Sequence, residues 1–324
     1  MNYRSFGNTG FACSEIGFGA WAIGGNWGPQ DKSDSLEALH KALDSGINFI
    51  DTAAGYGEGK SERIIAEVLK ERKESVFVAT KTQPAPGDWP PSPYDNWEDR
   101  YGEAYLRNHV EERLRMLQTD CLDLLQLHTW TRAWNRNPEP FAILQKLKAE
   151  GKLKWIGVST PEIDQNSVID LMRGGWVDAV QVIYNLFEQE PAAELLPVAQ
   201  ETGTAIIVRV AFDEGALTGK FTKETTFEEG DFRRNYFAGD RLERTVKRVE
   251  AIRGDAEEMG MDLPTLALKF VLGHPAVSTV IPGMRNRRQA KLNAAVSDQR
   301  DLTEAEIVRL RRHQWRRTFW YMGK

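Results

Sequence analysis

The sequence is poor in cysteine and in long apolar runs. Its 324 residues include two cysteines, Cys13 and Cys121, and they form neither a disulfide framework nor a metal-binding pattern. No stretch approaches the length that crosses a bilayer, and the first five residues do not open a signal peptide. We therefore expect a cytoplasmic protein without a membrane segment or a metal site.

An excess of either charge is also missing. The chain has 42 basic and 47 acidic side chains, for a net charge of -5. This balance gives no electrostatic reason to expect nucleic acid or a membrane surface as a partner. It is compatible with a small neutral or anionic ligand, and it does not indicate an oligomeric state. No linker or low-complexity segment interrupts the chain, so we expect one domain over residues 1–324.

Strand-like and helix-like segments alternate along the chain. Strand candidates centre on Ile16, Phe49, Val78, Leu124, Ile156, Val180, Ile207 and Val280. Helix candidates begin near Ser33, Ser61, Tyr105, Pro138, Asp164, Ala192, Arg241 and Arg287. Eight of each predict an α/β fold, a closed (β/α)8 barrel. A short β-hairpin is expected before the barrel, with one extended run from Tyr3 to Phe6 and a second from Phe11 onward. An amphipathic helix is expected at residues 304–320 after the barrel.

Two connections are too long to be simple turns. Residues 82–100 contain five prolines, and residues 221–240 are rich in charge. Loops near twenty residues are often functional, and alternation places both at the carboxyl ends of strands. We expect them to border the site.

Two glycine-rich segments match nucleotide-binding motifs without their context. Residues 17–22 fit G-x-G-x-x-A, but the chain continues as loop where the motif requires a helix. Residues 54–61 fit a relaxed P-loop, but Ala54 replaces the first glycine. No downstream strand ends in the acid that such enzymes use for magnesium. A P-loop nucleotide hydrolase is therefore a minor alternative.

Four polar residues lie at or just after the ends of three consecutive predicted strands. Asp51 ends the first of these strands and Tyr56 follows five positions later, while Lys81 and His128 end the next two. In a parallel barrel the carboxyl ends of the strands meet at one mouth. These side chains are therefore expected to converge.

This ordered set resembles the hallmark residues of the aldo-keto reductases. The similarity extends over nearly the whole chain, through GFGAW at residues 17–21, GVS at 157–159, Gln181, GALTGK at 215–220 and IPG at 281–283. It implies a barrel whose bottom is closed by the hairpin. It also implies a metal-free oxidoreductase that uses NADPH or NADP+ to interconvert a small carbonyl compound and an alcohol.

The resemblance gives the four polar residues their roles. Tyr56 is the expected proton donor, and because a free phenol titrates near about 10, Lys81 is expected to lower its pKa. Asp51 would keep Lys81 charged and oriented. His128 would hydrogen-bond the substrate oxygen, although a lone histidine is more often structural. Lys81 taken alone also fits the Schiff-base lysine of an aldolase.

The resemblance also implies a cofactor site. Its expected residues are Ser159, Thr160, Gln181, Arg209, Phe212, Gly215, Leu217, Gly219, Lys220, Gly283, Arg285, Gln289 and Asn293. Arg285 would pair with a 2'-phosphate, since a guanidinium offers a fork of donors.

Two of these positions depart from the family pattern. Thr160 replaces the usual Asn, and Arg209 stands where relatives carry an aromatic residue that stacks on the nicotinamide. We expect Arg209 to lie against the ring, with pairing to Asp213 or Glu214 as the alternative.

Tryptophans are expected around the pocket mouth. Trp21, Trp27, Trp89 and Trp130, with Trp134, would form walls for a flat apolar ligand or a sugar face. Packing is the alternative role for Trp21 and Trp27. A nucleotide-binding, redox-sensing subunit of a larger assembly remains a second functional hypothesis.

Overall fold

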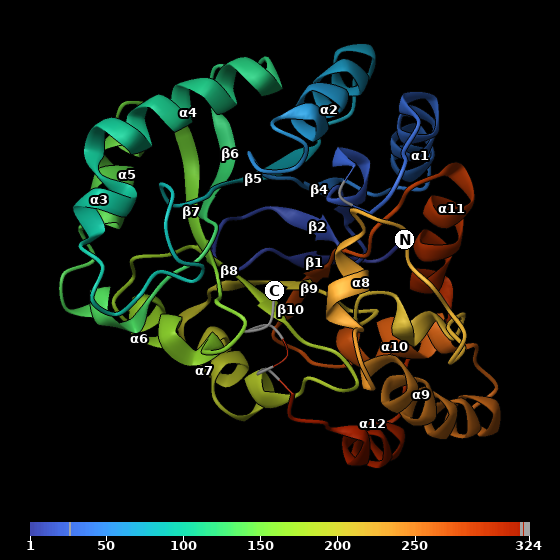
Figure 1. Cartoon of the computed structure of the whole chain (residues 1–324). Helices are drawn as coiled ribbons and strands as arrows, with labels where there is room; N and C mark the ends of the chain where they lie inside the picture. The colour runs from blue at the N-terminus through green and yellow to red at the C-terminus, as the bar shows by residue number, and fades with distance from the viewer. Residues whose placement is uncertain (26, 318–319, 321–324) are drawn as a thin grey trace.

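Parallel strands line the centre of the computed structural model, which describes residues 1–25, 27–317 and 320 (Figure 1). One sheet runs in the order β10-β9-β8-β7-β6-β5-β4-β3. Its strands are β3 (Phe18–Gly19), β4 (Phe49–Asp51), β5 (Phe77–Thr82), β6 (Leu122–Leu127), β7 (Leu153–Ser159), β8 (Ala179–Ile183), β9 (Ala205–Arg209) and β10 (Val277–Val280). Parallel bridges from Ile16 to Val280 and from Gly19 to Gly283 join its two edges. The predicted (β/α)8 barrel is therefore confirmed.

Helices surround the strands on the outside (Figure 1). They are α1 (Lys32–Asp44), α2 (Lys60–Glu71), α3 (Trp97–Tyr101), α4 (Glu103–Leu117), α5 (Glu139–Ala149), α6 (Ile169–Arg173), α7 (Leu195–Thr202), α8 (Phe232–Tyr236), α9 (Arg241–Glu258), α10 (Leu263–Leu272), α11 (Arg287–Ala295) and α12 (Glu304–Leu310). Strands such as β5 and β8 are buried along their whole length, because helices cover the outer face and side chains fill the interior.

The N-terminal hairpin closes the bottom of the barrel. It pairs β1 (Tyr3–Ser5) with β2 (Ala12–Ser14) in antiparallel register. The Phe6 ring lies 5.2 Å from the rings of both Phe49 and Phe77, measured between centroids. These contacts fill the end at which the strands begin, so the opposite end is left for ligands.

Helix α10 was not predicted. Eight of its ten residues are buried, so it shows no polar stripe and does not follow the amphipathic pattern of a surface helix. Its start does carry a recognisable signal, because Asp262 accepts a hydrogen bond from the Thr265 amide and a proline follows in the first turn.

The C-terminal helix is shorter than predicted. It was expected over residues 304–320 but ends at Leu310, followed by the 3-10 turn η7 (Arg311–His313). Tertiary contacts draw the chain away from the helical path. His313 Nε2 lies 2.5 Å from the buried Asp255 carboxylate, and the Trp315 amide donates to the Phe187 carbonyl at 2.8 Å. Within the described ranges, no helix is both long and apolar enough to traverse a bilayer.

Candidate active site

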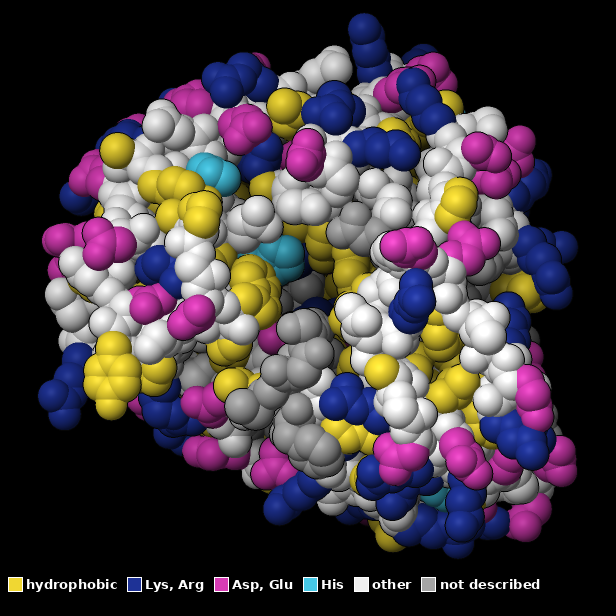
Figure 2. Space-filling view, viewed as in Figure 1, with side chains coloured by type: hydrophobic (Ala, Val, Ile, Leu, Met, Phe, Trp, Pro, Cys, Tyr) yellow, Lys and Arg dark blue, Asp and Glu magenta, His cyan; other side chains and the backbone are white. Residues whose placement is uncertain are grey.

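A cleft of about 1090 Å³ opens at the carboxyl ends of the strands. Hydrophobic side chains gather around the hollowed mouth, and charged side chains surround it farther out (Figure 2). Both long connections contribute to it, Trp89 from residues 82–100 and Arg233 from residues 221–240. The cleft therefore lies where the two long loops were expected to border a site.

Asp51 and Lys81 form a buried ion pair at the base of the cleft. The Lys81 ammonium is 2.5 Å from Asp51 Oδ1, and neither side chain is more than 2% exposed. Lys81 also donates to the Thr52 carbonyl at 2.9 Å and to the Tyr56 hydroxyl at 3.2 Å. Its three donors thus have three acceptors, which fixes the position of the ammonium.

The other carboxylate oxygen of Asp51 is also held. Asp51 Oδ2 accepts from Gln181 Nε2 at 2.7 Å and from Gln126 Nε2 at 3.2 Å. A buried charge is stable only when it is paired and hydrogen-bonded, and Asp51 meets both conditions. The carboxylate therefore stabilises Lys81 as an ammonium.

The pKa values of Tyr56 and Lys81 follow from their burial and from the charges near them. Burial raises the pKa of Tyr56, and the Lys81 ammonium lowers it by less, so the net direction is upward. Burial lowers the pKa of Lys81, but Asp51 and Tyr56 together raise it by more. Lys81 thus lowers the phenol pKa as predicted without bringing it below its ordinary value. At neutral pH Tyr56 carries its proton and Lys81 its charge.

His128 faces Tyr56 across the cleft. Its ring centroid is 6.0 Å from that of Tyr56 and 5.3 Å from that of Trp89, both edge-on. Its backbone amide donates to the Thr82 carbonyl at 2.9 Å, which continues the pairing between β5 and β6. A carbonyl oxygen placed between the phenol and the imidazole would meet two polar side chains.

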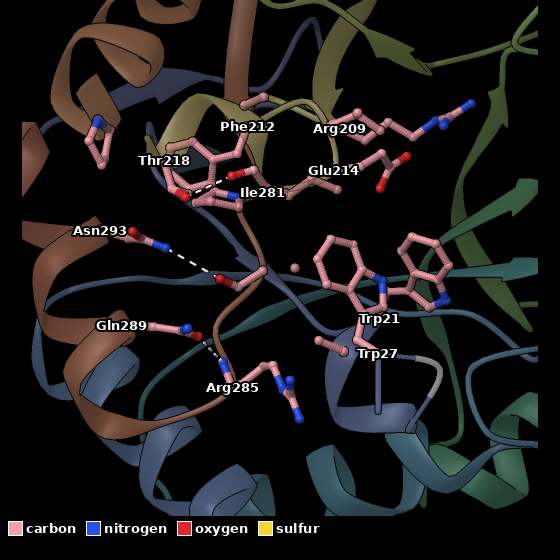
Figure 3. Close-up of a pocket in the computed structure, with 18 of the residues that line it drawn as sticks. Trp21, Trp27, Arg209, Phe212, Glu214, Thr218, Ile281, Arg285, Gln289 and Asn293 are labelled. Carbon is pink, nitrogen blue, oxygen red and sulfur yellow. Dashed lines mark hydrogen bonds between the residues drawn. The ribbon is translucent and has the colours of Figure 1, made fainter. Parts of the chain in front are cut away.

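The other side of the cleft is formed by the loops after β9 and β10 (Figure 3). Of the predicted cofactor residues, the structure brings Ser159, Gln181, Arg209, Phe212, Gly215, Lys220, Gly283, Arg285, Gln289 and Asn293 to the cleft wall. Val210, Asp213 and Glu214 have φ values of 58°, 50° and 55°, although none is glycine. Each such conformation costs about 1–3 kcal/mol and persists only where the surroundings enforce it.

Arg285 is held by the loop before α1. Its Nε donates to Gln30 Oε1 at 2.8 Å, its Nη2 donates to the Pro29 carbonyl, and Gln30 Nε2 donates back to the Arg285 carbonyl at 2.8 Å. The Arg285 amide donates to Gln289 Oε1, as Figure 3 shows. The guanidinium is therefore oriented at the cleft edge before any anion binds.

Arg209 does not pair with the residues that the sequence suggested. Its Nη2 donates to the Thr160 carbonyl at 3.0 Å and lies 3.8 Å from Glu162 Oε1. Asp213 instead pairs with Arg317. The expected alternative of an Arg209 pair with Asp213 or Glu214 is therefore wrong, because a carboxylate on the β7 side lies within reach of the guanidinium.

Some predicted residues lie outside the cleft. Trp130 is fully buried, donates to Asn135 Oδ1 at 2.7 Å and packs on Phe141, so its expected place in the mouth is wrong. Trp134 is buried beside it. Trp21, Trp27 and Trp89 do line the cleft, and Figure 3 shows Trp21 and Trp27 together at its edge.

Three of the predicted cofactor residues do not line the cleft. Thr160, Leu217 and Gly219 are not among the residues lining the cleft. The Thr160 hydroxyl is buried and donates to Gln165 Oε1 at 3.1 Å, and Leu217 is wholly buried. The side chains of Thr160 and Leu217 therefore belong to the scaffold under the cleft, and binding of a cofactor by Leu217 and Gly219 stays a prediction about their backbone amides.

Several cleft residues were missed. Gln83 and Glu162 follow the ends of β5 and β7, so the same strand-end rule that found Asp51 could have found them. Arg233, Arg253 and Thr265 come from α8, α9 and α10. No local pattern marks those three, because helix packing alone brings them to the cleft.

Glycines within and just after the rejected dinucleotide motif have packing roles. A Cβ on Gly19 would lie 2.4 Å from the Ile281 carbonyl oxygen, at the seam that closes the barrel. A Cβ on Gly24 would lie 2.7 Å from the backbone of Tyr56. Close backbone contact therefore explains these glycines, and η1 (Ala22–Gly24) takes the place of the helix that the motif requires.

The cleft suits a dinucleotide together with a substrate. Ligand pockets typically measure about 300–1,000 Å³, and this cleft, at about 1090 Å³, lies at the upper end of that range. Among the described residues, Arg209 Nε and Trp27 Nε1 are buried donors that have no hydrogen-bond partner. A basic edge at Arg285 and Arg288 lies along the same cleft as Tyr56. These donors and cations fit a long anionic ligand.

Comparison with known proteins gives consistent results. The Aldo/keto reductase family model matches residues 15–314. The aldo-keto reductase YhdN of Bacillus subtilis is 34% identical over 93% of this chain and 92% of its own length. The glycerol dehydrogenase AKR11B4 of Gluconobacter oxydans superposes with a TM-score of 0.78, at 28% identity over 96% of this chain and 94% of that one. An aldo/keto reductase of Klebsiella pneumoniae, solved with NADP and acetate, gives a TM-score of 0.72 at 24% identity and covers 98% of both chains.

Proposed function

This chain belongs to the aldo/keto reductase family, and from that premise we propose that Tyr56 is its general acid and base in interconverting a carbonyl and an alcohol. The protein is an oxidoreductase of this family with NADP(H) as cofactor. Bound NADPH supplies the hydride, and the protein supplies binding, orientation and a proton.

Proton transfer falls to Tyr56. Its raised pKa keeps the hydroxyl protonated at neutral pH, which is the form that reduction needs. Lys81 stabilises the phenolate that remains after the proton has left, at 3.2 Å from its oxygen. Asp51 keeps Lys81 in place, and His128 hydrogen-bonds the substrate oxygen from the other side.

The cofactor is assigned to the loops after β7, β8, β9 and β10. Ser159 and Gln181 would hold the carboxamide of the nicotinamide, and Arg209 would lie along the ring. Residues 215–220 offer backbone amides and Lys220 for the pyrophosphate. Arg285, Gln289 and Asn293 would hold the adenosine end, with the 2'-phosphate on Arg285.

The alternative functions have less support. A Schiff-base lysine must lose its proton readily, whereas the pKa of Lys81 is raised by its carboxylate. The P-loop match at residues 54–61 conflicts with the family membership. A sensing subunit would bind cofactor without turnover, so turnover separates it from an enzyme.

One observation carries the proposal: a single buried ammonium bonds both the Asp51 carboxylate and the Tyr56 hydroxyl at the base of the cleft. The test is a panel of aldehydes, apolar ketones and aldoses with NADPH or NADH, and of the matching alcohols with NADP+. Tryptophan walls suit both flat apolar ligands and sugar faces, so the panel includes both. NADPH oxidation by any carbonyl is expected; binding of NADPH without turnover of any compound would favour the sensing alternative.

A further inference from the structure

We infer that Arg317 is a positioning residue for the cofactor side of the cleft, which it supports from behind. The inference rests on the proposed function, because it concerns the affinity for NADPH. It starts from residues 210–215, called here the β9 loop. Three residues of this loop, Val210, Asp213 and Glu214, have positive φ without being glycine.

The β9 loop needs external support. Left-handed backbone is disfavoured for residues with a side chain, most of all for a β-branched residue such as Val210. At its start, Asn185 Nδ2 donates to the Val210 carbonyl at 2.9 Å. At its centre, the support comes through Asp213.

Asp213 points away from the ligand side. Every other residue of the β9 loop lines the cleft, whereas Asp213 does not. Its side chain is 2% exposed, and its Oδ1 accepts a hydrogen bond from Arg317 Nη2. A buried carboxylate needs such a partner, so the Arg317 guanidinium stabilises this conformation of the loop.

Arg317 connects the loop to α8 as well. Its Nη1 donates to the Tyr236 hydroxyl at 3.0 Å, and the guanidinium lies over the rings of Trp315 and Phe187 at 4.7 and 4.9 Å. Tyr236 ends α8, whose first two residues reach the cleft tryptophans. Phe232 lies 5.5 Å from Trp21, and the Arg233 guanidinium lies 4.5 Å from Trp27.

One buried guanidinium therefore joins the β9 loop to α8, the helix that contacts the cleft tryptophans. Arg317 does not line the cleft itself, so it acts on a ligand only through the elements that it holds. Its loss is expected to weaken cofactor binding and to leave proton transfer by Tyr56 intact once cofactor is saturating.

The test compares three variants, Arg317→Met, Asp213→Asn and the double variant of these two, with a control variant, Arg316→Met. Arg316 is the control because its side chain is 80% exposed. NADPH dissociation constants are measured by fluorescence quenching, together with KM, kcat and Tm. Each single variant is expected to weaken NADPH binding by about tenfold and to change kcat by less than about threefold. The double variant is expected to bind NADPH no more weakly than either single variant, because the two residues act as one pair. Arg316→Met should match the wild type.

A purely structural role predicts another pattern. If Tm falls but the NADPH dissociation constant of Arg317→Met stays within about twofold of wild type, the inference is overturned. If Arg317→Met does not fold, Tyr236→Phe and Arg317→Lys replace it, and unchanged NADPH affinity in both overturns the inference as well.

Failure of the proposed function would look different. In that case the wild type would turn over no carbonyl compound, and if it still bound NADPH the dissociation constants would decide the inference as above. If the wild type did not bind NADPH either, those constants could not be measured. The inference would then be judged by hydrogen exchange of the β9 loop amides, which are expected to exchange faster in Tyr236→Phe and Arg317→Lys than in Arg316→Met. Equal exchange in all three would overturn it.

Discussion

The two halves of the cleft are built on different principles. The catalytic half, Asp51, Tyr56, Lys81 and His128, lies at or just after the ends of β4, β5 and β6, and three of its side chains are joined in one hydrogen-bonded chain. The cofactor half, residues 209–220 and 283–293, uses left-handed backbone and is held by distant side chains such as Gln30 and Arg317. The first half is held by hydrogen bonds among its own side chains and from Gln126 and Gln181 on nearby strands, whereas the second is held by side chains from distant loops.

The strongest test of this contrast removes one atom from the catalytic half. Tyr56→Phe is expected to lower kcat about a thousandfold or more, because the transferred proton is lost. The NADPH dissociation constant should stay nearly unchanged, since the cofactor half is intact. Tyr94→Phe is the control, as Tyr94 is 97% exposed. Retention of a tenth of the activity would mean that Tyr56 is not the acid.

Lys81→Met is expected to lower kcat about as much and to destabilise the protein. The variant leaves Asp51 buried without its cation, which costs about 3–5 kcal/mol in the free energy of unfolding. Lys269→Met is the matched control: Lys269 is equally buried, but its partner Asp301 is largely exposed, and neither residue lines the cleft. Turnover of that control should be unchanged.

The pH dependence sharpens the Lys81 test. Reduction needs the Tyr56 proton, so its rate falls as pH rises through the raised pKa, while alcohol oxidation needs phenolate and rises with pH. Because Lys81 lowers the pKa of Tyr56, residual oxidation by Lys81→Met should require higher pH than in the wild type. A borohydride-trapped adduct of substrate on Lys81 would instead support the aldolase alternative.

A smaller effect is expected in the cofactor half. Arg285→Ala should weaken NADPH binding by about 1.5–3 kcal/mol, or about 10- to 150-fold, with little change in the affinity for NADH. Gln30→Ala should reproduce part of this loss, because Gln30 orients the guanidinium. Lys291→Ala, an exposed position on α11, the helix that follows Arg285, is the control. Equal losses for both coenzymes would show that Arg285 does not bind the 2'-phosphate.

The smallest effect is expected at Arg209. A guanidinium along the ring disfavours the cationic oxidised nicotinamide, by about 1 kcal/mol for unit charges about 4 Å apart in water. Arg209→Tyr should therefore shift relative affinity toward NADP+ by up to about fivefold. Glu162 lies within 4 Å of the guanidinium and partly offsets its charge. An unchanged ratio of the two dissociation constants would place Arg209 away from the ring.

The errors of the sequence analysis share a cause. Trp130 was assigned to the mouth because it follows a strand end, but its side chain turns inward to Phe141 and Asn135. Arg209 was matched to carboxylates nearby in sequence, whereas its contacts come from Thr160 and Glu162, which follow β7, the next strand but one in the sheet. Neither the direction of a side chain nor a contact between strands is encoded by local spacing.

The sequence by itself determined the barrel and the meeting of Asp51, Lys81 and Tyr56. Alternating strands and helices leave few ways to close a parallel sheet, and strand ends in such a sheet converge on one mouth. Only the tertiary structure decided the shape of the cofactor half. There, helix α10, the turn of the chain after Leu310 and the burial of Arg317 against Asp213 depend on which surfaces pack together. Packing energy comes from contacts between residues distant in the chain, so no local pattern reports it.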